Sequence, residues 1–225
     1  FTHFGLFPQD RIRFWRMQCG SFIQDEMSLS LKTYCRIKDN EVHINGELFC
    51  QHMDEEPFLR SVYKHIGLTY PKFFKMDELS RLGFIGAEMT LMRSELENYA
   101  DDEVAVIFSN RSSSLQTDFE YYDTLKSGIA SPALFVYTLP NIEVGEICIR
   151  HKLYGENNFL ITERFNAAQL LEQCEALFAD NAAKAVLIGW TEVNGDEHDG
   201  FFAFITNAGV EELTAESLTD IYLDR

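Results

Sequence analysis

Basic residues are scarce in this chain: 19 lysine and arginine side chains stand against 36 aspartate and glutamate side chains, giving a formal net charge of -17. A surface this acidic repels nucleic-acid phosphates, which argues against nonspecific nucleic-acid binding. Long apolar runs are missing too, because no stretch approaches the ~20 residues of a membrane-spanning helix. We therefore expect no nucleic-acid partner and no membrane span.

Cysteine is also sparse, and its spacing shows no pairing pattern. The five cysteines are Cys19, Cys35, Cys50, Cys148 and Cys174. An odd number without close pairs is typical of a reducing compartment. The sequence shows no typical secretory signal peptide either. We expect a cytoplasmic protein.

The chain divides into a short first segment and a longer domain. Residues 1–26 are rich in aromatic and arginine side chains and follow neither a strand nor a helix period. We expect residues 1–26 to be an extension of unknown role and residues 27–225 to form the folded domain. A sharper alternative makes the extension a partner-binding or membrane-surface segment. Its residues would be Arg11, Arg13, Phe14, Trp15 and Arg16.

Helical and strand patterns alternate along the domain. Strands are expected at 30–37, from 42, at 104–109, 185–189 and 201–205, and helices at 56–65, 76–97, 115–126, 166–179 and 215–223. The run VAVIFS at 104–109 is apolar throughout, as expected for a strand buried on both faces of a sheet. This alternation predicts an α/β fold.

An ordered set of motifs runs through the second half of the chain. It comprises Ser131-Pro132, Pro140-Asn141, the turn 154–157 (YGEN) and Thr191-Glu192. In this order the motifs resemble the N-terminal half of the β-ketoacyl-ACP synthases of the thiolase superfamily, over residues 30–205. The resemblance implies a thiolase-like half-fold, with a mostly parallel central sheet and helices on both faces. Residues 27–225 would then form a ketosynthase N-terminal-like domain.

The resemblance places an arginine where these enzymes carry their nucleophilic cysteine. Counting forward from Gly155 and back from Glu192 brings Arg164 to that position without a gap. A guanidinium stays protonated and cannot attack a thioester. Glu163, Arg164 and Phe165 are therefore interpreted as degenerate active-site positions, with no catalytic residue among them. The family's second half supplies two histidines, and we expect the residues after 205 to leave no room for it.

Two other segments could supply a nucleophile. Cys148 lies in the helix expected after Pro140-Asn141, and Ser112, Ser113 and Ser114 form a turn after the strand 104–109. The structural interpretation is that Cys148 is a buried apolar residue and that the serines cap the next helix. The catalytic interpretation is a relocated cysteine or serine nucleophile.

The segment 194–200 contains four potential metal ligands, among them His198. Acidic loops are usually solvated, and one histidine fixes no coordination geometry. We expect neither a metal site nor a cofactor.

The resemblance implies a non-catalytic ketosynthase-like subunit, similar to a chain length factor, in fatty-acid, polyketide or aryl-polyene type biosynthesis. Its partner would be a second copy of itself or an active ketosynthase, with an acyl carrier protein as a further candidate. The alternative is an acyltransferase or thioester hydrolase that uses one of the relocated nucleophiles.

Overall fold

The computed structural model describes residues 28–52, 56–209 and 212–225, so the expected extension 1–26 lies outside the described residues. Strands are β1 (Ser30–Lys38), β2 (Glu41–Ile44), β3 (Glu47–Gln51), β4 (Val104–Asn110), β5 (Asn157–Ile161), β6 (Ala185–Asn194) and β7 (Glu197–Thr206). Helices are α2 (Phe58–His65), α3 (Glu78–Leu91), α4 (Leu115–Lys126), α5 (Pro132–Val136), α6 (Ile142–His151), α7 (Ala167–Ala179) and α8 (Ala215–Tyr222). Short 3-10 turns lie at Pro71–Lys75 and Leu96–Asn98.

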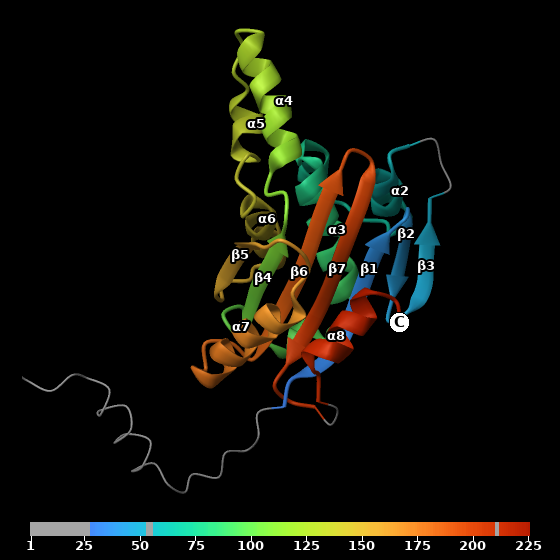
Figure 1. Cartoon of the computed structure of the whole chain (residues 1–225), viewed down its shortest axis with the longest axis vertical. Helices are drawn as coiled ribbons and strands as arrows, with labels where there is room; N and C mark the ends of the chain where they lie inside the picture. Colours follow the sequence, from blue (N-terminus) through green and yellow to red (C-terminus); the bar gives the residue numbers. More distant parts are fainter. Residues whose placement is uncertain (1–27, 53–55, 210–211) are drawn as a thin grey trace, which may run out of the picture.

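In the described part of the chain, the strands form one seven-stranded mixed sheet in the order β3-β2-β1-β7-β6-β4-β5 (Figure 1). Only β4 pairs in parallel with its neighbours, β5 and β6; the other four pairings are antiparallel. The expectation of a mostly parallel sheet is therefore wrong. The reason is that β2, β3 and β7 each follow the preceding strand through a tight turn, and a tight turn joins only antiparallel strands.

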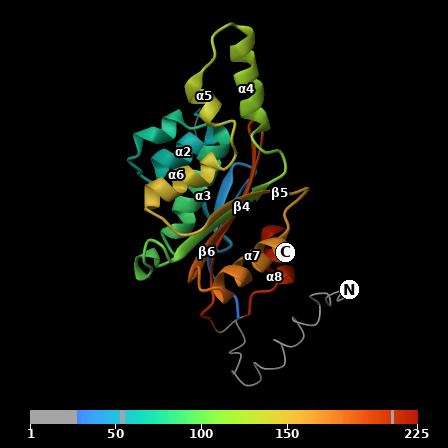
Figure 2. The ribbon, with the colours of Figure 1, turned by 90° about the vertical axis from the view of Figure 1, so that its left-hand side faces the viewer.

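Helices cover both faces of the sheet, as the sequence predicts (Figure 2). The first core lies under α2, α3 and α6, and the second lies under α7 and α8. Strand β7 contributes side chains to both cores, because successive side chains of a strand point to opposite faces of the sheet. Phe202 and Phe204 belong to the first core, and Phe201, Ala203 and Ile205 belong to the second.

Helix α3 begins at a side-chain cap and packs closely on the sheet. Asp77 accepts a hydrogen bond from the Ser80 backbone N–H at 3.0 Å, which satisfies one free donor of the first turn. Gly86 faces Phe202, and a Cβ atom at Gly86 would lie 1.9 Å from that ring. Glycine is therefore needed there for the close approach of α3 to β7.

Helices α4 and α5 form a hairpin, called the arm below, that projects beyond the end of the sheet (Figures 1 and 2). The two helices contact each other through Tyr121 and Phe135, whose ring centroids lie 5.4 Å apart. At the base of the arm, Thr117 Oγ1 donates to Asp77 Oδ2 at 2.6 Å. The arm is thus tied to the N-terminus of α3.

Candidate functional site

Five strands direct their carboxyl ends to one edge of the sheet, because β1, β3, β4, β5 and β6 run in the same direction. Ligands of α/β sheets bind at this edge. A polar cleft of about 600 Å³ opens there. It is lined by Lys38, Asp39, Asn40, Arg111, Glu192, Asn194, Asp196, Glu197, His198 and Asp199. We take this edge, with the turn after β5, as the candidate site.

The three predicted degenerate positions lie in the turn between β5 and α7, but their side chains lie in different environments. Glu163 and Arg164 are exposed, and Thr162 Oγ1 donates to the Arg164 carbonyl at 3.0 Å. Arg164 lies two residues before Asn166, which caps α7 by accepting a bond from the Gln169 N–H at 3.1 Å. The guanidinium is therefore at the surface, outside the helix.

Phe165 belongs to the second core instead. Its ring stacks on Tyr222 of α8 with centroids 4.2 Å apart and meets Phe201 edge-on at 5.4 Å. The Tyr222 hydroxyl donates to Asp199 Oδ2 at 2.7 Å, and Arg36 pairs with the other oxygen of Asp199 at 2.6 Å. The last helix is thus fastened to the sheet beside the turn that carries Arg164.

The three serines of the turn after β4 make hydrogen bonds that stabilise the turn locally. The Ser112 N–H donates to Glu192 Oε2 at 3.3 Å, and the Ser113 N–H donates to Asn110 Oδ1 at 2.9 Å. Ser114 is buried and its hydroxyl donates to the Thr138 carbonyl at 2.5 Å. Within residues 28–52, 56–209 and 212–225, no histidine hydrogen-bonds to any of these hydroxyls. Ser114 Oγ also lies 3.4 Å and 3.5 Å from the two carboxylate oxygens of Asp118, which is too far for a strong hydrogen bond. The turn therefore supplies no histidine base to activate a serine.

Cys148 lies in α6, half-buried against the first core. Burial raises the pKa of its thiol to about 11. The nucleophile of thioester chemistry is the thiolate, which a raised pKa suppresses at neutral pH. This environment is the opposite of an activated cysteine.

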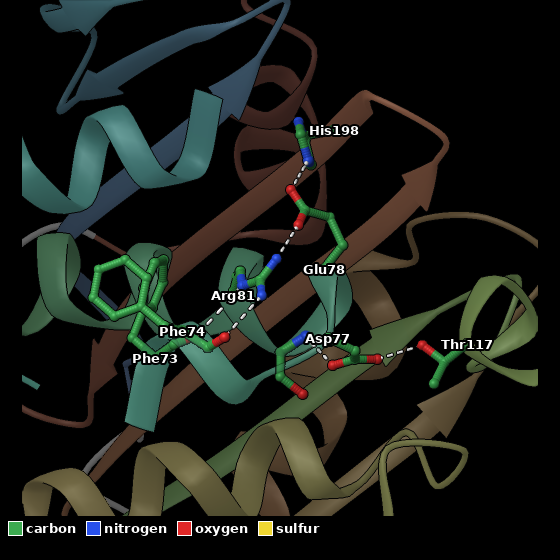
Figure 3. Close-up of polar contacts among 8 residues, drawn as sticks. Phe73, Phe74, Asp77, Glu78, Arg81, Thr117 and His198 are labelled. Carbon is green, nitrogen blue, oxygen red and sulfur yellow. Dashed lines mark hydrogen bonds and ion pairs between the residues drawn. The ribbon is translucent and has the colours of Figure 1, made fainter. Parts of the chain in front are cut away.

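The sequence analysis missed a polar network at the start of α3 (Figure 3). Glu78 hydrogen-bonds to His198 Nε2 at 3.0 Å and accepts from Arg81 Nη1 at 2.9 Å. Burial raises the pKa of Glu78, but these two partners outweigh it and bring the pKa below its usual value. His198 itself is 8% exposed.

His198, which the sequence analysis counted among four potential metal ligands without expecting a metal site, therefore pairs with a carboxylate. The described residues contain no group of three or more His, Cys, Asp or Glu side chains placed so that they could hold a metal ion. Nδ1 of His198 is buried without a hydrogen-bond partner. Glu78 thus orients His198 through Nε2. In the described structure, no hydroxyl or thiol bonds to the other nitrogen, Nδ1.

A second missed feature is the fully buried acid Glu143 in α6. Its Oε2 accepts a hydrogen bond from Thr191 Oγ1 at 3.0 Å, while Oε1 has no partner. Burial and the nearby Asp77 raise the pKa of Glu143 well above its usual value, against the lowering effect of Thr191. One signal was present in the sequence: Glu143 lies beside Val144 and one turn before Ile147, which are both buried.

No protein-family model matches the sequence, and no curated protein matches it. Solved structures match the fold. The ishigamide ketosynthase/chain length factor aligns with a TM-score of 0.60 and 12% identity, covering 82% of this chain and 64% of its own. A β-ketoacyl synthase from Burkholderia phymatum gives a TM-score of 0.56, 10% identity and coverages of 80% and 59%. The alignments therefore cover less than two thirds of the length of each of those two chains.

A third match differs in length. A ketosynthase in complex with its chain length factor, from Xenorhabdus doucetiae, gives a TM-score of 0.54 and 13% identity. The alignment covers 82% of this chain and 81% of that one, so the two chains are nearly equal in length. The fold of this protein is the thiolase-like fold of ketosynthases and chain length factors.

Proposed function

We propose that this protein is a non-catalytic, chain-length-factor-like subunit that pairs with an active ketosynthase in fatty-acid, polyketide or aryl-polyene type biosynthesis. The similar structures include a ketosynthase bound to its chain length factor and a type II polyketide synthase carrier protein bound to its ketosynthase. The alignment with a chain of the first complex extends over 82% of this chain.

The observation that carries the non-catalytic part of the proposal is the turn after β5. The side chains there are an exposed glutamate, an exposed arginine and a phenylalanine packed on Tyr222. None of the three is the cysteine thiol that a ketosynthase acylates. In the described structure no histidine hydrogen-bonds to the side chains of Cys148, Ser112, Ser113 or Ser114, and Ser114 has only a long contact with Asp118. The acyltransferase or hydrolase alternative therefore has less support.

The open edge of β5 supports the pairing part. Val106 N–H donates to the Glu156 carbonyl, and Thr162 N–H donates to the Asn110 carbonyl. Even-numbered residues therefore direct their backbone groups to β4, and the odd-numbered Asn157, Phe159 and Ile161 direct theirs to the open edge. An edge with free N–H and C=O groups is a template for a strand of another chain.

The distribution of exposed apolar side chains points to the same side. Most large apolar side chains that are exposed in the described structure lie between Leu115 and Ile161, on the arm, α6 and β5. The outer face of α7 is different, because Glu172 and Glu175 are exposed there. The side of the molecule that carries the arm and β5 therefore exposes apolar surface of the kind that a partner covers. The side that carries α7 exposes charged side chains, which solvent hydrates.

Co-expression with the ketosynthase of the same pathway tests the proposal. We expect a 1:1 complex by native mass and ketosynthase activity that depends on this subunit. Ile161→Pro removes an N–H that faces the open edge, and we expect at least about a tenfold weaker complex. Ile161→Thr keeps that N–H and is the matched control. A complex that tolerates Ile161→Pro would contradict edge pairing, and the absence of any complex would contradict the subunit role.

A further inference from the structure

The outer face of α4 carries an apolar stripe that the protein itself leaves uncovered. Leu115, Phe119 and Tyr122 recur at helical spacing and are 49%, 63% and 56% exposed. The opposite face of α4 already has its contacts, since Thr117 bonds to Asp77 and Tyr121 meets Phe135. An amphipathic helix normally turns its apolar stripe inward. Here Thr117 and Tyr121 face the protein, and the three side chains of the apolar stripe face out.

Charge distinguishes between the possible occupants of this stripe. Helix α4 carries the exposed acids Asp118, Glu120 and Asp123 and one exposed cation, Lys126. Lys126 is paired with Asp123 at 3.0 Å and lies over the Tyr122 ring at 4.3 Å. The stripe is therefore bordered by net negative charge. A second copy would bring the same acids against these, with a net charge of -17 on each molecule.

We infer that the α4 stripe binds an apolar surface bordered by lysine and arginine on the ketosynthase partner, and that it does not bind a second copy of this chain. This inference rests on the proposed function and adds a second contact surface, separate from the β5 edge. The centre of the contact supplies apolar burial, and the border sets which partner is accepted.

Binding to the ketosynthase, measured at about 50 mM and about 500 mM NaCl, tests the inference. Glu120→Lys with Asp123→Lys reverses the charge of α4, and we expect at least about tenfold weaker binding at low salt and a smaller effect at high salt. Glu172→Lys with Glu175→Lys is the matched control, because it changes the net charge equally on the outer face of α7. It should leave binding within about twofold of the wild type.

A second double variant tests the contribution of the apolar side chains of the α4 stripe. Phe119→Ser with Tyr122→Ser shortens two exposed side chains, and we expect at least about tenfold weaker binding with an unchanged melting temperature. Binding that persists at wild-type strength in both arm variants would overturn the inference and leave the edge-pairing proposal intact. Absence of any ketosynthase binding would remove both proposals.

Sedimentation of the protein alone addresses self-association. We expect a monomer at low salt, and a mixture of the wild type with the Glu120→Lys, Asp123→Lys copy should associate at least about tenfold more tightly than the wild type with itself. A stable wild-type dimer at low salt would contradict the exclusion of a second copy. Equal association of the wild type with the α7 control would show that total charge, and not the arm, decides.

Discussion

Replacing the buried acid Glu143 with glutamine should change how the stability of this protein depends on pH. Glu143 is 1% exposed, and its raised pKa means that the folded protein keeps the carboxyl protonated where an unfolded chain would release the proton. Glutamine has nearly the same shape, and its amide oxygen can accept the hydrogen bond of Thr191. The substitution therefore removes ionisation and preserves the packing.

The sign of the Glu143 effect on the free energy of unfolding, and its greatest slope with pH, follow from proton linkage. Between the usual glutamate pKa of 4.5 and the raised folded value, the native state holds more protons than the unfolded state at this site. Glu143 therefore makes the free energy of unfolding fall as pH rises through that window, by up to about 1.4 kcal/mol per pH unit. Below pH 4.5 the penalty disappears. Glu143→Gln should match the stability of the wild type near that pH and exceed it by a growing margin as the pH rises to 8.

Urea unfolding at closely spaced pH values, for the wild type and Glu143→Gln, measures this difference. Glu78 and Glu88 have lowered pKa values and contribute slopes of the opposite sign, which cancel when the two proteins are subtracted. Glu175→Gln on the exposed side of α7 is the control, because it makes the same chemical change at an exposed position. A difference between the wild type and Glu143→Gln that stays constant from pH 5 to 8 would refute the reasoning.

Three further predictions follow from the site and the core. Arg164→Ala should leave pathway activity and the melting temperature nearly unchanged, because the side chain is exposed; complete loss of activity in a folded variant, measured by product formation, would contradict a non-catalytic turn. Cys148 should form no acyl adduct with acyl-CoA at neutral pH, since burial raises its pKa; an adduct in intact-mass spectra that Cys148→Ser abolishes would restore the enzyme alternative. Gly86→Ala should destabilise the fold by about 1–3 kcal/mol in urea unfolding, because the new methyl group overlaps the Phe202 ring; an unchanged unfolding midpoint would contradict the close packing of α3 on β7.

Much of the element order could be predicted from the sequence because apolar periodicity is a local signal. The run at 104–109 is a strand buried along its whole length, and the helices expected at 115–126 and 166–179 are present as α4 and α7. The helix expected at 76–97 ends early, at Leu91, and Glu95 beyond it takes a left-handed conformation. Side-chain spacing alone did not reveal this stop.

Strand direction was the main error, and one turn explains part of it. The segment 194–200 was interpreted as a polar loop, but Asn194 pairs with Glu197 across a two-residue turn that contains Gly195 at φ 61°. Gly-Asp at the two central positions of a two-residue turn is a hairpin signal, so this correction was available from the sequence. The partners of Glu143 and His198 were not, because they come from distant segments and a buried carboxylate resembles a solvated one in the sequence.

The central position of β7 also has a consequence for how the protein is made. Strand β1 is among the first described segments to leave the ribosome, yet one of its two neighbours in the sheet, β7, lies more than 150 residues later. Until β7 is synthesised, β1 and β6 both lack a strand that the finished sheet places between them. Such non-local pairing slows folding, since a long loop must close before any contact repays it. The nascent chain therefore leaves one side of β1 unpaired for most of its synthesis, and one side of β6 joins it shortly before β7 is made. Chaperone demand should be highest just before residue 206 emerges.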